Sequence, residues 1–296
     1  MTVPVLEIGG THVTAALVDP EAARVLDSLR RPLHAEAPAG EIVGDLVACA
    51  AGLGPAVADH WGVAIPGPFD YERGVGLFSG VAKFEGLHGV DLRAALLPRL
   101  PGGPTEITFL NDAHAFALGE WVRCGAPRRM VGITLGTGVG GAFLADGVAV
   151  RSGPEVPPGG VVHLLTHAGR PLEDTVSRRA LRRTYAAVSG NLDADVHEIA
   201  EAARAGDPVA RTVFDDAFRA LGSVLAPWLE RFCASTVVVG GSVAGSWDLV
   251  AGPLRAGLDL PGVDLVRARH LHDAALLGAA WHTRRDSDDN IPGARR

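Results

Sequence analysis

Two stretches of this chain share one pattern, in which an apolar run, a glycine-rich turn and a second apolar run follow one another. The first is LEIGGTHVTAALV, residues 6–18, and the second is GITLGTGVGGAFL, residues 132–144. Apolar runs joined by a short glycine turn are typical of β-hairpins. Their recurrence predicts a duplicated βββ-type unit, led in each copy by the hairpin, with a ligand cleft between the two copies.

The rest of the chain alternates between runs with strand character and runs with helical periodicity. The predicted strands are 3–8, 13–18, 61–68, a strand–turn–strand–turn–strand stretch at 130–150, 235–241 and 263–268. The predicted helices are 41–53, 113–122, 174–187, 194–205, 207–232 and 273–282. Strands that alternate with helices indicate an α/β architecture.

The length of the chain favours two domains. A chain of 296 residues lies near the size at which a single core stops growing. We expect an N-terminal domain over 1–111, on which the helix 273–284 packs back, and a larger domain over 112–272. The polar end of the chain, 285–296, is expected to be a disordered tail.

Composition excludes several classes of partner. The formal net charge is −7, which gives no electrostatic support for nucleic-acid binding. The three cysteines lie far apart without a CxxC spacing, which favours a reduced, cytoplasmic environment over a disulfide framework. We find no export leader at the start of the sequence and no uncharged run of membrane-spanning length.

Glycine turns offer backbone N–H groups to an anion such as a phosphate. A single turn of this kind is more simply interpreted as a hairpin, but three together favour a nucleotide site. Their residues are Gly9, Gly10, Thr11 and His12; Gly136, Thr137 and Gly138; and Gly240, Gly241 and Ser242. No Walker loop is present, and Lys83, the only lysine, lies in no phosphate-binding motif.

The stretch FLNDAHAFALGE, residues 109–120, places an Asn-Asp pair between a strand and a helix. Asn or Asp at such a junction can simply cap the helix. Alternatively, Asp112 can take the proton of an alcohol that attacks a γ-phosphorus, while Asn111 orients that alcohol. The two interpretations are compatible, because Asn111 can be the cap while Asp112 faces a ligand.

The motifs EIGGT, GVAIPGP, NDA, GITLGTGVGG and VVVGGS occur in this order along nearly the whole chain. This succession resembles the ROK family of bacterial sugar kinases and sugar-responsive repressors. The resemblance implies the actin-like ATPase (ribonuclease H-like) fold, with two α/β domains around a cleft that binds Mg-ATP and a sugar. It also implies that Asp112 is the catalytic base and Asn111 a substrate contact. Pro66 and Gly67 would form part of the sugar pocket wall.

The chain departs from the family pattern at several positions. Glu7 stands where members commonly carry the Asp that helps to position Mg²⁺, and His12 stands where Lys or Arg often follows the threonine. His163 fits the His of the family's E-x-G-H sugar motif, and Glu173 fits the later sugar-contacting Glu. The Glu of that motif falls on Gly160, although Glu155 could reach in from the loop. No cysteine lies between His163 and Glu173, so we predict no zinc.

The resemblance therefore implies ATP-dependent phosphotransfer to the C6 hydroxyl of a hexose or an aminohexose. Divergent relatives in antibiotic-producing actinobacteria phosphorylate aminosugars such as kanosamine. Carboxylates near the sugar would bind the amine of such a substrate through charge-assisted hydrogen bonds. Donors other than ATP, including polyphosphate, stay open, and a homodimer is common among similar proteins. The competing interpretations are a sugar-responsive regulator and a non-catalytic sugar-binding protein. A regulator would carry a winged-helix segment before the first glycine motif, which here begins at Glu7.

Overall fold

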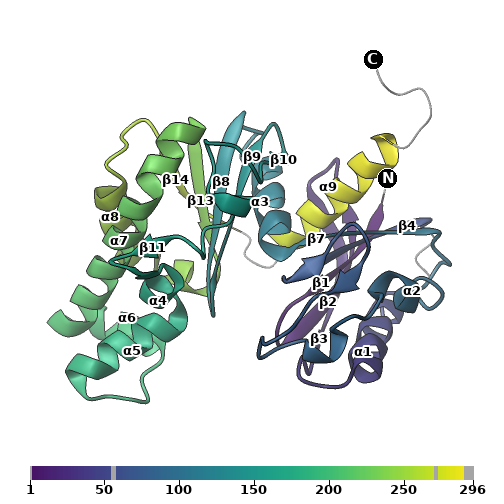
Figure 1. Cartoon of the computed structure of the whole chain (residues 1–296), viewed down its shortest axis with the longest axis horizontal. Coiled ribbons are helices and arrows are strands. Elements are labelled where there is room, and N and C mark those ends of the chain that lie inside the picture. Colours follow the sequence, from purple (N-terminus) through teal and green to yellow (C-terminus); the bar gives the residue numbers. More distant parts are fainter. Residues whose placement is uncertain (1, 55–57, 270–272, 290–296) are drawn as a thin grey trace. The chain divides into compact units, whose positions relative to one another are not determined.

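The computed structural model describes residues 2–54, 58–269 and 273–289, and the chain forms two compact units (Figure 1). Unit 1 comprises Met1–Arg123 and His272–Arg296, and unit 2 comprises Cys124–Leu271. The division falls at the end of helix α3 (Asp112–Arg123) rather than at its start, because α3 packs against helix α9 (Ala274–Asp289). Helix α9 continues through 285–289, which we expected to be tail, and 290–296 lie outside the described residues.

Unit 1 is built on a mixed sheet whose strand order, over the described residues, is β3-β2-β1-β4-β7. Strands β1, β2 and β3 are antiparallel neighbours, and β4 and β7 run parallel to β1. The bounds are β1 Val3–Ile8, β2 His12–Asp19, β3 Arg24–Pro32, β4 His60–Ile65 and β7 Glu106–Asn111. Around them lie α1 Ala39–Ala51, β5 Phe69–Asp70, β6 Val75–Gly76, the 3-10 turn η1 Glu85–Leu87 and α2 Leu92–Leu96.

Alternation along β1 divides its side chains between the two faces of this sheet. Leu6 and Ile8 belong to a buried cluster that includes residues of α1 and α2. Val3 and Val5 belong to another cluster, which includes residues of α9 and α3. Because successive side chains of a strand point to opposite faces, Glu7 lies on the α9 face, beyond the end of its apolar cluster.

Unit 2 repeats the same topology, with the strand order β10-β9-β8-β13-β14 over the described residues. Again three antiparallel neighbours are followed by two parallel strands, which confirms the predicted duplication of the hairpin-led unit. The strand bounds are β8 Arg129–Leu135, β9 Val139–Ala145, β10 Val148–Ala149, β11 Thr166–His167, β12 Arg170–Pro171, β13 Thr236–Gly240 and β14 Asp264–Arg267. The helices are η2 Pro158–Gly160, α4 Glu173–Val176, α5 Arg178–Ser189, α6 Val196–Arg204, α7 Pro208–Phe232, η3 Ser242–Ser246 and α8 Trp247–Leu258.

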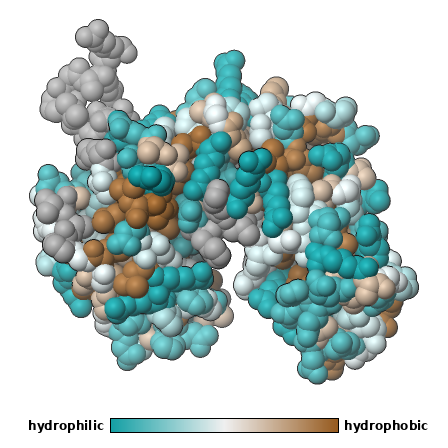
Figure 2. Space-filling view, turned by 180° about the vertical axis from the view of Figure 1, so that it is seen from behind, coloured by the Kyte–Doolittle hydropathy of each residue, from teal (hydrophilic) through white to brown (hydrophobic). Residues whose placement is uncertain are grey.

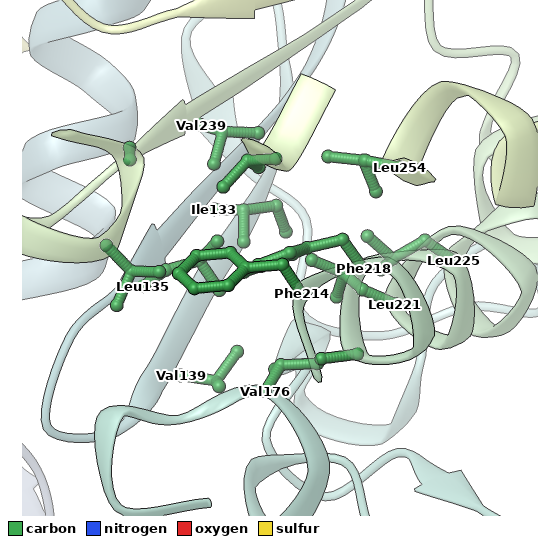
Figure 3. Packing of buried hydrophobic residues seen from close by; sticks show 14 of the residues in the cluster. Ile133, Leu135, Val139, Val176, Phe214, Phe218, Leu221, Leu225, Val239 and Leu254 are labelled. Carbon is green, nitrogen blue, oxygen red and sulfur yellow. The ribbon is translucent and has the colours of Figure 1, made fainter. Parts of the chain in front are cut away.

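The core of unit 2 forms where the long helix α7 meets the sheet (Figure 3). Phe214 and Phe218 of α7 are fully buried and lie among residues of β8, β13 and α8. Burying side chains of this size contributes roughly 2–3 kcal/mol each. This packing fixes the strands whose ends carry the second and third glycine turns.

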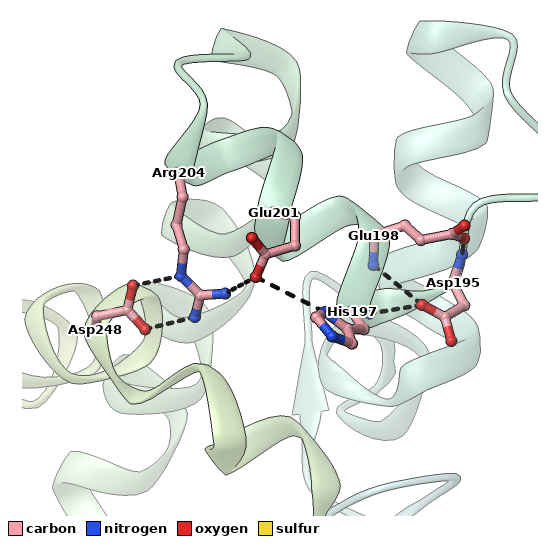
Figure 4. A network of polar contacts seen from close by, with 6 residues as sticks. All are labelled: Asp195, His197, Glu198, Glu201, Arg204 and Asp248. Atoms are coloured by element: carbon pink, nitrogen blue, oxygen red, sulfur yellow. Dashed lines mark hydrogen bonds and ion pairs between the residues drawn. The ribbon is translucent and has the colours of Figure 1, made fainter.

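Polar contacts join α6 to α8 on the surface of unit 2 (Figure 4). Arg204 donates from Nε and Nη2 to the two carboxylate oxygens of Asp248, at 2.9 and 2.7 Å, and from Nη1 to Glu201 at 2.6 Å. Asp195 and Glu198 form a capping box at the start of α6. Exposed ion pairs contribute at most about 1 kcal/mol, so this network supports the packing of the two helices rather than determining it.

Several short elements, α2, β5, β6, β11 and β12, were not predicted, and two longer segments differ from the sequence-based expectations. Strand β3 is absent from the predicted set, because its nine residues are mostly polar and exposed and so lack an alternating apolar pattern. The helix predicted over 174–187 is interrupted at Ser177, whose side chain caps α5.

No helix within the described residues combines the length and the apolar character that a membrane crossing requires. The face shown in Figure 2 carries mostly hydrophilic side chains, with hydrophobic residues in smaller patches.

Candidate active site

The Asn-Asp pair lies at the carboxyl end of β7, where α3 begins. Asn111 Oδ1 accepts hydrogen bonds from the backbone N–H groups of Ala113 and His114, at 3.0 and 3.2 Å. Its Nδ2 donates to the hydroxyl of Tyr71 at 3.0 Å, and Tyr71 donates to the carbonyl oxygen of Ile65 at 3.3 Å. Asn111 is therefore the cap of α3, held from both sides. Asp112 Oδ1 shares one of these donors, since it accepts from the Ala113 N–H at 2.9 Å.

Asp112 and Glu7 form a pair of carboxyl groups with perturbed protonation. Burial raises the pKa of Asp112, and hydrogen bonds from Ala113 and Asn111 offset this only in part. Burial also raises the pKa of Glu7, as does the negative charge of Asp112, while Arg30 and Thr14 act in the opposite direction. Both groups lie near the carboxyl ends of parallel strands, which is where open α/β sheets bind ligands.

The predicted pocket wall lies beside Asn111. Ile65, the last residue of β4, is the register partner of Asn111, so Pro66 and Gly67 follow directly at this edge of the sheet. A Cβ placed on Gly67 would lie 3.3 Å from the Tyr71 hydroxyl. Unit 1 thus brings Pro66, Gly67 and Asn111 together through Tyr71, a residue that the sequence analysis did not single out.

The first glycine turn closes the β1–β2 hairpin, as predicted. The backbone N–H of Gly9 donates to the carbonyl oxygen of His12 at 2.8 Å, and Thr11 Oγ1 lies 2.8 Å from His12 Nδ1. The side chain of Lys83 lies across Gly10, since a Cβ placed there would be 2.8 Å from Lys83 Cδ and closer still to Nζ. Sequence patterns gave no sign of this contact, because 73 positions separate Lys83 from Gly10 and no motif includes both.

The second and third glycine turns meet in unit 2. Gly240 is the register partner of Thr134 in the neighbouring strand β8. Gly241 has φ of +85°, and a Cβ on it would lie 2.6 Å from the backbone nitrogen of Leu135. A Cβ on Gly136 would lie 3.9 Å from Ser242 Oγ. The predicted nucleotide-binding residues of unit 2 therefore lie next to one another.

Glu173 lies against the second glycine turn. Its Oε2 accepts a hydrogen bond from the backbone N–H of Val139 at 3.3 Å, and a Cβ on Gly138 would lie 2.8 Å from the same oxygen. Its Oε1 accepts from Arg179 Nη2 at 2.9 Å. Glu173, which lies beside the second turn, is thus paired with the guanidinium group of Arg179.

The loop before Glu173 explains why no glutamate stands at position 160. Gly160 has φ of +66°, and a Cβ on it would lie 3.1 Å from Arg151 Cα and closer to the Val150 carbonyl oxygen. Any side chain here would therefore require the backbone to move. The Glu155 carboxylate lies against Gly153 of its own loop, and His163 is exposed. Among the described residues, no hydrogen bond or ion pair joins Glu155 or His163 to Glu173.

A cluster that could hold a metal ion occurs at the other end of the unit 1 sheet. Within the described residues, the ligand atoms of His60, Glu106 and Asp286 all lie within 4.8 Å of one another. The Thr108 hydroxyl contacts the His60 ring and donates to Asp286 Oδ2 at 3.3 Å. His60 and Glu106 begin β4 and β7, whereas Asn111 ends β7. The cluster is thus separate from the candidate active site, and its hydrogen bonds tie α9 to the sheet.

Comparison with known proteins gives the same family as the motifs. A family model described as "ROK family" matches residues 4–286. An N-acetylmannosamine kinase of Escherichia coli O139:H28 is 32% identical over 95% of this chain and 97% of its own length.

Solved structures of this family share the fold. A ROK hexokinase from Thermus thermophilus superposes with a TM-score of 0.80 at 28% identity, covering 98% of this chain and all of the other. A ROK family glucokinase from Streptomyces griseus, solved with glucose and AMPPNP, has a TM-score of 0.73 at 29% identity and covers 96% of this chain and all of its own. The chain therefore has the actin-like ATPase fold that the resemblance implied.

Proposed function

Since the chain belongs to the ROK family, we propose that it is an ATP-dependent sugar kinase. In this proposal Asp112 takes the proton of the sugar hydroxyl that attacks the γ-phosphorus of ATP. The main support for this assignment is that Asn111 and Asp112 have different roles. Asn111 caps α3, so Asp112 is left as a carboxyl group whose pKa burial raises. A base whose pKa lies closer to the working pH is a more effective proton acceptor.

In this reaction one proton moves, one bond to phosphorus forms and another bond to phosphorus breaks. The hydroxyl proton moves to the Asp112 carboxylate, and the hydroxyl oxygen forms a bond to the γ-phosphorus. The bond from that phosphorus to the bridging oxygen breaks, and its electron pair leaves with ADP. Asn111, held by Tyr71, positions the sugar, while the glycine turns at Gly9–Gly10, Gly136–Gly138 and Gly240–Ser242 bind the nucleotide.

Mg²⁺ fits the charges around Glu7 in this proposal. The pKa values of Glu7 and Asp112 are both raised, and the charge of Asp112 contributes to the rise at Glu7. A divalent cation beside Glu7, held partly through water, would relieve this repulsion, and oxygen ligands suit it. When bound, Mg²⁺ would neutralise negative charge on the phosphates.

For the acceptor we propose the C6 hydroxyl of a hexose or aminohexose. The loop geometry at Gly160 supports a pocket that differs from the common family pattern, because it admits no glutamate there. Glu173, His163 and Glu155 remain the proposed sugar contacts of unit 2. The 32% identity to a protein named N-acetylmannosamine kinase supports including amino-substituted hexoses.

A coupled ADP-release assay against a sugar panel tests this function. The panel contains glucose, mannose, glucosamine, N-acetylmannosamine and kanosamine, each with ATP. A parallel series replaces ATP by polyphosphate, and there the sugar phosphate is measured by NMR, because polyphosphate releases no ADP. We expect sugar-dependent ADP release at about 1–100 s⁻¹ for at least one sugar. NMR of the product should show the phosphoester at C6. Sugar binding by calorimetry without a phosphorylated product from either donor would instead indicate the non-catalytic alternative. Glucose used as well as the aminohexoses would exclude the aminosugar preference.

Replacing Tyr71 by phenylalanine removes the hydroxyl that accepts from Asn111. The variant also loses the bond to the Ile65 carbonyl oxygen, but only the bond from Asn111 involves a proposed sugar contact. Loss of that bond, worth about 1 kcal/mol, predicts a roughly 5-fold higher KM for the sugar with a smaller change in kcat. Tyr185→Phe is the matched control, because the other tyrosine of the chain donates to Asp207 in unit 2. Steady-state kinetics in which both variants match the wild type would show that Tyr71 does not position Asn111.

A further inference from the structure

Lys83 is the only lysine in a chain that carries 26 arginines. An arginine-rich composition of this kind favours arginine wherever any positive charge suffices. The two side chains differ physically, because lysine ends in a compact, flexible ammonium group and arginine in a wide planar fork. Beside a glycine turn the compact ammonium group needs less room than the guanidinium fork.

The side chain of Lys83 covers the first glycine turn of unit 1. A Cβ placed on Gly10 would lie 2.8 Å from Lys83 Cδ and 3.1 Å from Cε, and closer still to Nζ. The far end of the lysine therefore occupies the space that any residue larger than glycine would fill at position 10. The lysine side chain, as well as the hairpin turn, therefore accounts for the glycine at position 10.

The backbone of Lys83 is held by the residue that follows it. Phe84 is 2% exposed, and its ring lies 5.3 Å from that of Phe78 within the buried cluster on the α1 side of the sheet. The backbone N–H of Phe84 donates to the carbonyl oxygen of Ala35 at 2.6 Å. These contacts anchor the backbone from which the lysine side chain reaches Gly10.

The charge of Lys83 is not matched by a carboxylate. Lys83 is half-buried, and none of the ion pairs among the described residues includes its ammonium group. Glycine turns can offer backbone N–H groups to anions, as the ammonium group does, although the Gly9 N–H is bonded within the hairpin to the carbonyl oxygen of His12. The combination is a site for an anionic ligand with high charge density.

We propose that Lys83 Nζ contacts the phosphate oxygens of the nucleotide at the first glycine turn and stabilises the phosphoryl group as it is transferred. This inference rests on the proposed kinase function and extends it to a residue outside every recognised motif. It supplies the fixed positive charge that a chain without a Walker lysine needs from another source. Lysine acts on phosphates as a point charge, which its single ammonium group at the turn provides.

The test compares Lys83→Met, which keeps the length and loses the charge, with Arg99→Met, an exposed cation of the same unit. We expect kcat/KM for ATP to fall about 100-fold in Lys83→Met, the size of effect seen when one charge-stabilising group is removed. The sugar Kd by calorimetry and Tm should stay within error of the wild type, and Arg99→Met should be unchanged throughout. A kcat/KM for ATP within 3-fold of the wild type, or a change confined to the sugar KM, would overturn the proposal.

Two further measurements separate this inference from the function on which it rests. Gly10→Ala should displace the lysine, so the double variant Gly10→Ala/Lys83→Met should be no worse than Lys83→Met alone. Fully additive losses would contradict the contact. AMPPNP binding by calorimetry should weaken about 10-fold or more in Lys83→Met even if the wild type releases no ADP with any sugar. Lack of turnover refutes the kinase proposal, whereas equal AMPPNP affinity in both proteins refutes the role of Lys83.

Discussion

Asp112→Asn is expected to lower turnover by about 10²–10⁴-fold while sugar affinity stays within about 2-fold of the wild type. Asparagine has nearly the same shape and keeps an oxygen that can accept from the Ala113 N–H, so the start of α3 is preserved. It cannot take a proton from the sugar hydroxyl. Coupled kinetics and calorimetry measure the two quantities, and Asp91→Asn, which keeps an oxygen at the N-cap of α2, is a control. Turnover within 3-fold of the wild type would contradict the assignment of Asp112 as the base.

The same variant should be more stable than the wild type at neutral pH. The pKa of Asp112 is raised above its ordinary value of 3.8, so ionisation of this buried carboxyl group opposes folding. The cost is absent below pH 3.8 and grows as pH rises through the interval up to the raised pKa. We therefore expect Asp112→Asn to raise Tm by about 2–4 °C at pH 7 and by much less near pH 4. A lower Tm at pH 7 would indicate that Asp112 contributes to stability instead.

The largest effect on stability is expected from Gly278→Ala. Helices α3 and α9 approach each other through glycines, and a Cβ on Gly278 would lie 2.7 Å from the Ala115 carbonyl carbon and 2.8 Å from the Gly119 nitrogen. Backbone atoms cannot rotate away as a side chain does, so the helices must separate. Overpacking of this kind costs about 3 kcal/mol, which corresponds to a fall in Tm of about 6–12 °C. Because α3 begins at Asp112, kcat should fall as well.

Gly44→Ala is the matched control for that change, since Gly44 also lies inside a helix, α1, but a Cβ added there meets no atom of another segment within 4 Å. There the substitution should stabilise the chain by about 0.5–1 kcal/mol, because alanine favours the helix. Thermal melts of both variants decide the point. Equal Tm values would show that α3 and α9 tolerate a wider separation than their glycines indicate.

Local patterns were sufficient to predict most of the fold. Glycines between apolar runs predicted both hairpins, and helical periodicity predicted α7 and α9. Strand β3 was missed because an edge strand with exposed polar side chains carries no apolar alternation. The extent of unit 1 depends on the close packing of α3 against α9, which involves glycines far apart in sequence.

The residues of the candidate site that were singled out from the sequence are those that belong to a sequence motif. Asn111, Asp112 and the glycine turns were predicted from their sequence context, and the capping role of Asn111 was one of two interpretations left open. Sequence patterns did not indicate the contacts of Tyr71 with Asn111 and of Lys83 with Gly10, because at least 40 positions separate the two residues of each pair. Contacts of this kind follow from the packing of the sheet and its loops and leave no periodic signal in the sequence.

The central claim is best tested by a crystal structure of the protein with its preferred sugar and AMPPNP. The account predicts a carboxylate oxygen of Asp112 at about 2.6–3.2 Å from the acceptor hydroxyl oxygen. That hydroxyl oxygen should also lie in line with the γ-phosphorus and its bridging atom. A structure in which Asp112 is directed away from the bound carbohydrate, with another group beside the acceptor hydroxyl, would contradict it.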